Sequence, residues 1–193
     1  YGLPIPDEQR LRSYVGPPLW YSFGDLGYEG ELLANLVTGY RSRYQDHYLD
    51  PEPFPGVIEL LHELRAAGVA LATATSKQAP MALAQMEHLG LSSVFDVIAG
   101  ATPDPASSKA TVIHEALTRL KARGVDISHP VIVGDSVWDV RGAQEAGIPV
   151  IGVGWGYATE DGLDEADAVC ETVEDLRTYL LDGVAKHARD RDS

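Results

Sequence analysis

The chain has 193 residues, 45% of them hydrophobic, so it is long enough to bury one sizeable core. A formal net charge of -14 without a dense basic cluster argues against nucleic acid as a partner. The single cysteine cannot form an internal disulfide, and no apolar run reaches the length of a membrane span. We therefore expect a soluble, cytoplasmic protein with no membrane partner, either a monomer or a homodimer.

The first part of the sequence, residues 1–54, predicts a helical unit. It has no strand-like run, and a long amphipathic helix is expected around Glu29 to Tyr48. We interpret the apolar and aromatic stripe of this helix as core rather than as a cofactor site. The Pro-rich segment Asp50–Pro55 predicts a domain boundary, which separates residues 1–54 from residues 55–193. The stripe consists of Leu33, Leu36, Val37, Tyr40, Tyr44 and Tyr48.

From Pro55 onward the hydrophobic period alternates between that of a helix and that of a strand. This alternation is typical of a βαβ fold, so we expect an α/β protein with a doubly wound parallel sheet. The charged tail from Lys186 is expected to fray. The predicted elements are a helix from Val57 closing at Gly68, strand 69–74, a helix from Pro80 to near Gly90, strand 94–99, helix 111–123, strand 131–134 with a helix after it, strands 149–153 and 168–170, and helix 173–181.

The most informative stretch is the apolar run that ends in Gly134 and Asp135. Three β-branched residues before Gly134 predict a strand buried on both faces, and Asp139 falls in the first turn of the next helix. Ligands bind at the carboxyl edge of open α/β sheets, and two carboxylates there suit Mg²⁺. The competing interpretation is that Asp135 only caps the helix. These residues alone do not decide between the two.

Two further segments place polar or basic residues near predicted strand ends. Thr75 and Ser76 follow a strand, where they could hold a phosphate oxygen at a helix N-terminus or simply cap that helix. Lys109 opens the next predicted helix, where a cation opposes the helix dipole. It is therefore a candidate for binding a phosphate or carboxylate, although most lysines are simply solvated.

In this order, the segments around Thr75, Lys109 and Asp135 resemble motifs two, three and four of the haloacid dehalogenase-like hydrolases. Val15–Leu19, which reads Val-Gly-Pro-Pro-Leu in the helical unit, makes the phosphoglycolate phosphatase-like branch the most similar. The resemblance implies a Rossmann-like core with a small helical cap domain.

The resemblance also implies roles for the site residues. Thr75 would hydrogen-bond the phosphoryl group, with Ser76 beside it, and Lys109 would neutralise the phosphoryl charge. Asp135 would bind Mg²⁺, and Asp139 would assist through water or by orienting Lys109.

The first motif of this family, an Asp-x-Asp-x-Thr that supplies the nucleophile, is missing from the sequence. Asp190–Asp192 has no strand before it, and Asp104 lies in a Pro-rich loop. We therefore expect an N-terminally incomplete chain that lacks its first strand and roughly 20 to 30 residues.

The sequence thus predicts, for the full-length protein, a Mg²⁺-dependent phosphatase that forms an aspartyl-phosphate. Its substrate would be a small phosphorylated metabolite, with phosphoglycolate as a candidate. The alternatives are a phosphate-metabolite binding protein without catalysis and a phosphomutase of the same family. A dehalogenase is disfavoured because that chemistry needs no metal.

Substrate choice is expected to lie in the helical unit, because the core motifs handle only phosphate and metal. Gly16, Pro17 and Pro18 would lie on a loop that faces the site, unless they only break a helix. Arg41, Arg43 and Lys77 could meet a substrate anion or be solvated, and the glycines of the segment 152–156 are expected to form a loop near the metal.

Overall fold

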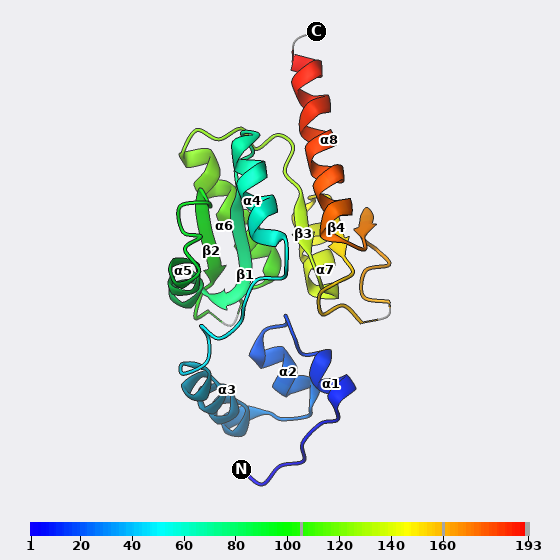
Figure 1. Cartoon of the computed structure of the whole chain (residues 1–193). Helices are drawn as coiled ribbons and strands as arrows, with labels where there is room; N and C mark the ends of the chain where they lie inside the picture. The colour runs from blue at the N-terminus through cyan, green and yellow to red at the C-terminus, as the bar shows by residue number, and fades with distance from the viewer. Residues whose placement is uncertain (105, 160, 192–193) are drawn as a thin grey trace.

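The computed structural model of the chain describes residues 1–104, 106–159 and 161–191. Three helices come first: α1 (Glu8–Arg12), α2 (Leu19–Asp25) and α3 (Gly30–Tyr44). Figure 1 shows them together at one end of the molecule, in blue, and we call them the helical segment. The Asp7 side chain caps α1, and an Arg10–Asp25 ion pair of 2.5 Å joins α1 to α2.

From residue 57 onward helices and strands alternate, as the sequence predicts. Every strand pairing is parallel, which confirms an α/β fold with a parallel-sheet core. The elements are α4 (Val57–Ala66), β1 (Ala72–Gln78), α5 (Ala79–His88), β2 (Val97–Ala101), α6 (Lys109–Ala122), β3 (Ile132–Gly134), α7 (Val137–Ala146), β4 (Val150–Val153), β5 (Ala168–Cys170) and α8 (Val173–Arg191).

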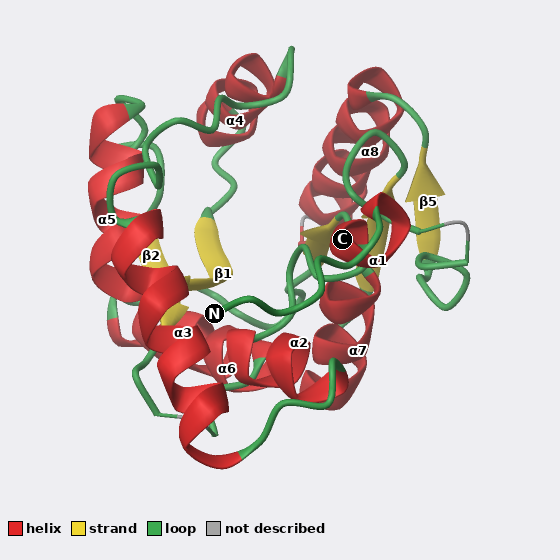
Figure 2. Cartoon of the chain, turned by 90° about the horizontal axis from the view of Figure 1, so that it is seen from below, coloured by secondary structure: helices red, strands yellow, loops and turns green. Residues whose placement is uncertain are grey.

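The strands form two separate sheets. One contains β1 and β2, and the other has the order β3-β4-β5. Figure 2 shows the two sheets apart, with β1 and β2 on one side and β5 on the other. Within the described residues, β1 and β3 each pair on one side only, so each presents an unpaired edge.

The prediction that the strand before Gly134 is buried on both faces is wrong. Val131 is 41% exposed and Val133 is 42% exposed. Among the described residues no strand lies on the other side of β3, so one flank of these side chains is left uncovered. A β-branched run indicates a strand, but its burial depends on what packs beside it.

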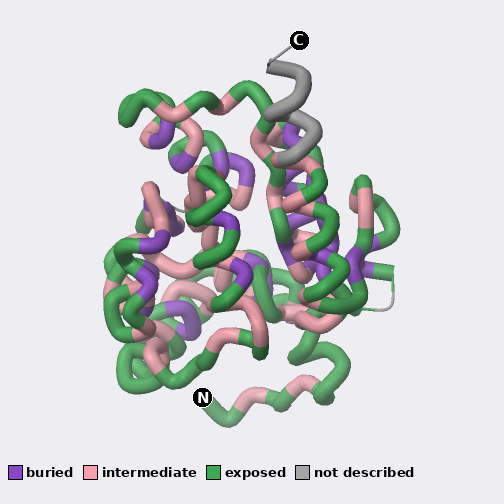
Figure 3. The backbone as a smooth tube through the Cα atoms, turned by 45° about the horizontal axis from the view of Figure 1, so that its top comes forward, coloured by how far each residue is buried: buried purple, intermediate pink, exposed green. Residues whose placement is uncertain are grey.

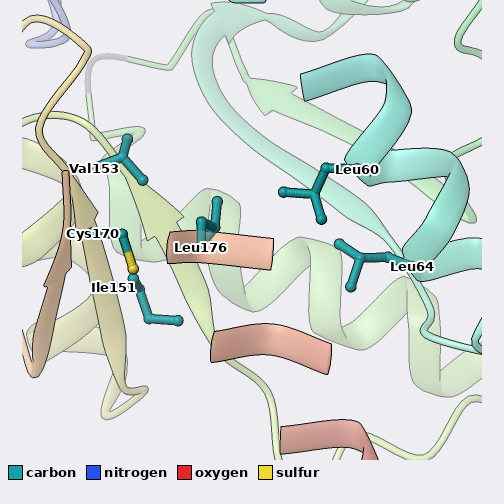
Figure 4. Packing of buried hydrophobic residues seen from close by; sticks show 6 residues of the cluster. All are labelled: Leu60, Leu64, Ile151, Val153, Cys170 and Leu176. Atoms are coloured by element: carbon teal, nitrogen blue, oxygen red, sulfur yellow. The ribbon is translucent and has the colours of Figure 1, made fainter. Parts of the chain in front are cut away.

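The hydrophobic core is divided in the same way as the sheets. One cluster joins α4, β4, β5 and α8, and Figure 4 shows its six buried side chains: Leu60, Leu64, Ile151, Val153, Cys170 and Leu176. A second cluster joins β2 to α6, and a third surrounds α7. Figure 3 shows the buried residues concentrated in this part of the chain, whereas the helical segment is mostly exposed or half-buried.

Several predicted boundaries are corrected by the structure. β1 spans 72–78 instead of 69–74, because the chain stays extended through a register shift between Thr75 and Gln78. β2 spans 97–101 instead of 94–99, and α6 begins at residue 109 rather than 111. The last helix continues to Arg191 instead of ending at residue 181, so the predicted fraying from Lys186 is replaced by helix as far as Arg191. Asp192 and Ser193 lie outside the described residues.

The long helix of the helical segment is shorter and more exposed than expected. α3 ends at Tyr44 rather than at Tyr48. Leu36 and Val37 are buried, as the core interpretation requires, but Tyr40 is 45% exposed. No helix within the described ranges is long and apolar enough to cross a membrane.

Candidate active site

The centre of the site is an ion pair between Lys109 and Asp139. The Lys109 Nζ lies 2.7 Å from Asp139 Oδ1 and donates a hydrogen bond of 2.9 Å to the carbonyl oxygen of Ala74. Both side chains are largely shielded from solvent, which strengthens their attraction. The pair therefore brings together the start of α6, the first turn of α7 and the middle of β1.

Local sequence explains why Lys109 opens α6. Ser108 caps the helix by accepting a hydrogen bond of 3.2 Å from the Thr111 N–H, and the Thr111 hydroxyl accepts one of 2.9 Å from the Ser108 N–H. This reciprocal capping box fixes the helix start. A cation at this position opposes the helix dipole, and Asp139 supplies the compensating charge.

Two glycines allow these elements to approach closely. A Cβ at Gly142, inside α7, would lie 2.6 Å from the Cβ of Lys109. A Cβ at Gly134 would lie 2.5 Å from the Cγ of Asp139. Real Cβ atoms do not tolerate such separations, so both contacts depend on the absence of a side chain.

The carboxylate of Asp139 is fully engaged with protein groups. Its Oδ2 accepts a hydrogen bond of 2.7 Å from the Ser136 hydroxyl and one of 3.2 Å from the Asp135 N–H, while its Oδ1 binds Lys109. Of the two roles considered for Asp139, this geometry favours orienting Lys109.

Asp135 lies in the turn between β3 and α7. Its Oδ2 accepts a hydrogen bond of 3.0 Å from the Tyr157 N–H. Burial raises the pKa of Asp135, because the charged form loses water there. The residue that caps α7 is Ser136, so the interpretation of Asp135 as a helix cap is wrong.

Asp135 fits a Mg²⁺ ion as part of its ligand set, whereas the Asp139 carboxylate is already bound to Lys109, Ser136 and the Asp135 N–H. Within the described residues there is no group of three or more histidine, cysteine or acidic side chains that could hold a metal. Mg²⁺ does not require such a group, since it commonly binds one or two carboxylates and keeps water or phosphate oxygens as its other ligands. A cation beside Asp135 would also compensate a carboxylate whose charge is disfavoured by burial.

Thr75 and Ser76 lie in the irregular end of β1, next to the carbonyl of Ala74 that binds Lys109. The Thr75 hydroxyl oxygen accepts a hydrogen bond of 3.1 Å from the Lys77 N–H. The helix that follows is preceded by Gln78, so neither Thr75 nor Ser76 is its cap. The competing cap interpretation for these two residues is therefore wrong.

Lys77 connects the end of β1 to the helical segment. Its ammonium group donates to the Gln85 side chain and lies 5.6 Å from the centre of the Tyr44 ring. Burial lowers the pKa of Lys77. Arg43 is exposed, and its side chain donates a hydrogen bond of 3.4 Å to the carbonyl oxygen of Gly39 within α3. Arg41 also lies in the last turn of α3.

The Gly16 loop and the glycine-rich loop after β4 both lie against the site. A Cβ on Gly16 would lie 3.3 Å from the Ser136 Oγ and 3.5 Å from the Trp138 ring, which places this loop against the start of α7. A Cβ on Gly156 would lie 2.7 Å from the Asp135 Cγ. The sequence analysis did not predict that Trp138 and Tyr157 lie at the site. For Tyr157, the glycines just before it in the sequence were the one feature that could have indicated this.

A family model described as haloacid dehalogenase-like hydrolase matches residues 1–153. The chain is 36% identical to tyrosine-protein kinase PtkA of Mycobacterium tuberculosis over 93% of its own length, but it spans only 62% of that relative. It is also 36% identical to a phosphoglycolate phosphatase of Caulobacter vibrioides, covering 81% of this chain and 68% of the relative.

Solved structures agree with the sequence comparisons. A haloacid dehalogenase-like hydrolase from Streptococcus pneumoniae superposes with a TM-score of 0.80 at 31% identity, covering 93% of this chain and 84% of that protein. The motifs recognised in the sequence therefore occur in the fold that they predict. The chain belongs to the haloacid dehalogenase-like hydrolases and resembles their phosphoglycolate phosphatase-like members.

Proposed function

We propose that this chain carries the phosphate- and metal-binding part of a Mg²⁺-dependent phosphatase that acts on a small phosphorylated metabolite. The observation that carries the proposal is the shielded Lys109–Asp139 pair, with Asp135 one turn away, at the carboxyl edge of parallel strands. The similarity to phosphatases supports the reaction type. Phosphoglycolate is one candidate substrate.

Each residue has a distinct part in this reaction. The Lys109 ammonium group neutralises the phosphoryl oxygens, and Asp139 holds it in position. The Thr75 hydroxyl donates to a phosphoryl oxygen, with Ser76 beside it. Mg²⁺, held by Asp135, would supply further neutralisation of the phosphate charge.

We also propose that the nucleophile is supplied by a segment that is not among these 193 residues. We propose that a strand from this segment pairs with both β1 and β3 and ends in the nucleophilic aspartate, which forms an aspartyl-phosphate. The unpaired edges of β1 and β3 and the exposed side chain of Val133 support this placement. The greater length of the relatives is consistent with it.

The proposal also covers the part played by the helical segment, the cellular location and the oligomeric state. The helical segment, with its boundary near residue 54, acts as a cap over the strand ends, and Asp50–Pro55 is one of its hinges. The location is cytoplasmic, and the protein acts as a monomer or a homodimer.

The proposal is tested by measuring phosphate release from a panel of phosphate esters with the full-length protein. Activity is expected with Mg²⁺ and none is expected after chelation. Lys109→Ala should lower kcat by at least about a hundredfold, the scale for losing one preorganised charged donor. Lys121→Ala, at the exposed end of the same helix, serves as the matched control and should leave kcat unchanged. A loss below threefold in Lys109→Ala would contradict the proposed role and leave Lys109 only a structural part, as the ion-pair partner of Asp139.

A further inference from the structure

A pocket of about 220 Å³ lies where the helical segment meets the core, beside the candidate active site. The helical segment contributes Tyr14 and Tyr21 to its walls. The core contributes Trp138 and Arg141 from α7, together with Tyr157 from the loop after β4. None of these five residues belongs to the phosphate and metal set described above.

The pocket shares two residues with the scaffold of the active site. Ser136 lines the pocket and donates its hydroxyl hydrogen to Asp139, and Tyr157 lines it while its N–H binds Asp135. A phosphate ester has its organic group within a bond or two of its phosphorus atom. An ester with its phosphate beside Asp135 would therefore place its organic group close to this pocket, because Tyr157 belongs to both.

Four of the residues that line the pocket are aromatic: Tyr14, Tyr21, Trp138 and Tyr157. Tyr21 and Trp138 meet edge to face, with ring centres 4.6 Å apart and an angle of 67° between the planes. Even so, Tyr21 is 46% exposed and Tyr157 is 51% exposed, so ring surface remains available. Aromatic groups bind one another in offset or edge-to-face geometry, which an aliphatic group cannot reproduce.

Arg141 adds a positive charge to this aromatic wall. Its guanidinium carbon lies 5.6 Å from the centre of the Trp138 ring, a cation–π distance. Across the described part of the chain Arg141 has no ion-pair partner, whereas Arg10, at the same pocket, is paired with Asp25. Arg141 is therefore free to contact the electron-rich face of a bound ring as well.

The volume of the pocket is sufficient for an aromatic ring. A cavity of roughly 150 Å³ is known to take up benzene, so 220 Å³ has room for one six-membered ring with its linking carbon. We propose that this pocket selects phosphate monoesters of alcohols that carry a single aromatic ring. This inference rests on the proposed phosphatase function and names its substrate class.

The test compares benzyl phosphate with cyclohexylmethyl phosphate, using the full-length protein. The two esters match in size and in leaving-group type and differ in aromaticity. We expect kcat/KM to be about tenfold higher for benzyl phosphate, the scale of one aromatic contact. Tyr21→Leu and Trp138→Leu should each lower this ratio several-fold. Tyr179→Leu replaces a tyrosine that is also about half exposed, on α8 and outside the pocket, and should keep the ratio.

Binding provides an arm that does not depend on turnover. Benzylphosphonate should bind about tenfold more tightly than cyclohexylmethylphosphonate in calorimetry with Mg²⁺ present, and Tyr21→Leu should remove the difference. Equal affinities, or a preference that survives Tyr21→Leu, would overturn the proposed pocket. If no ester of any kind is hydrolysed, the phosphatase function fails, while the two phosphonates still decide whether the pocket reads an aromatic ring.

Discussion

Gly142 offers a sharp test of how α7 positions Lys109. Replacing a glycine inside a helix with alanine normally stabilises a protein by up to about 1 kcal/mol. At Gly142, however, the new Cβ would lie 2.6 Å from the Cβ of Lys109, which belongs to the stiff base of that side chain. The helix or the lysine must therefore move.

The size of the movement follows from the contact distance. Carbon atoms in contact lie about 3.5 Å apart or more, so α7 and Lys109 must separate by about 1 Å. Overpacking of this kind costs about 1–3 kcal/mol, and the helix-propensity gain offsets part of it. We expect the free energy of unfolding to fall by at most about 2 kcal/mol. We expect a larger effect on kcat, about a hundredfold, because a 1 Å misplacement of a catalytic group has that scale.

The assay pairs urea unfolding with phosphate release, both on the full-length protein. Gly183→Ala is the matched control, since Gly183 is also helical, in α8, and a Cβ there would meet nothing within 4 Å. That variant should be slightly stabilised and fully active. The reasoning is refuted if Gly142→Ala behaves like Gly183→Ala in both measurements.

Two other substitutions test the metal-binding part of the site. Asp135→Ala should abolish Mg²⁺-dependent turnover, because Asp135 is the carboxylate left free by the Lys109–Asp139 pair. Asp164→Ala, which removes an exposed acid, is the control. Undiminished activity in Asp135→Ala would contradict the assignment. In Gly156→Ala the new Cβ would lie 2.7 Å from the Asp135 Cγ. We expect the Mg²⁺ concentration for half-maximal activity to rise about 10- to 100-fold, the usual effect of disturbing a group that supports a metal ligand. An unchanged Mg²⁺ titration would show that the loop shifts without moving Asp135.

The sequence was sufficient to predict which residues meet at the site. Thr75 lies in β1, Lys109 opens the helix between β2 and β3, and Asp135 directly follows β3. The carboxyl ends of parallel strands share one edge. The proximity of these segments therefore follows from the order of elements. The order of elements does not predict that Asp139 pairs with Lys109 while Asp135 stays free of that pair. These roles depend on hydrogen-bond geometry, which sequence spacing does not specify.

Contacts between distant segments could not be predicted from local patterns. The exposure of Val133 depends on the absence of a neighbouring strand, and a β-branched run contains no information about neighbours. Likewise, nothing in a helical period indicates that Trp138 meets Tyr21, which lies more than a hundred residues earlier. The pocket at this contact became visible only with the fold.

Lys109 also connects the two sheets of the core. Its ammonium group bonds Ala74 of the first sheet and Asp139, which follows the second sheet, so one side chain bridges two sheets that share no hydrogen-bonded pair. α6, which carries Lys109, packs against β1, β2 and α7 in the same way. Removing one partner of a shielded ion pair costs about 3–5 kcal/mol in other proteins, because the remaining charge is left without compensation. The phosphate site and the junction of the two sheets are therefore stabilised by the same pair, and Lys109→Ala should lower the free energy of unfolding together with kcat, whereas Lys121→Ala should change neither.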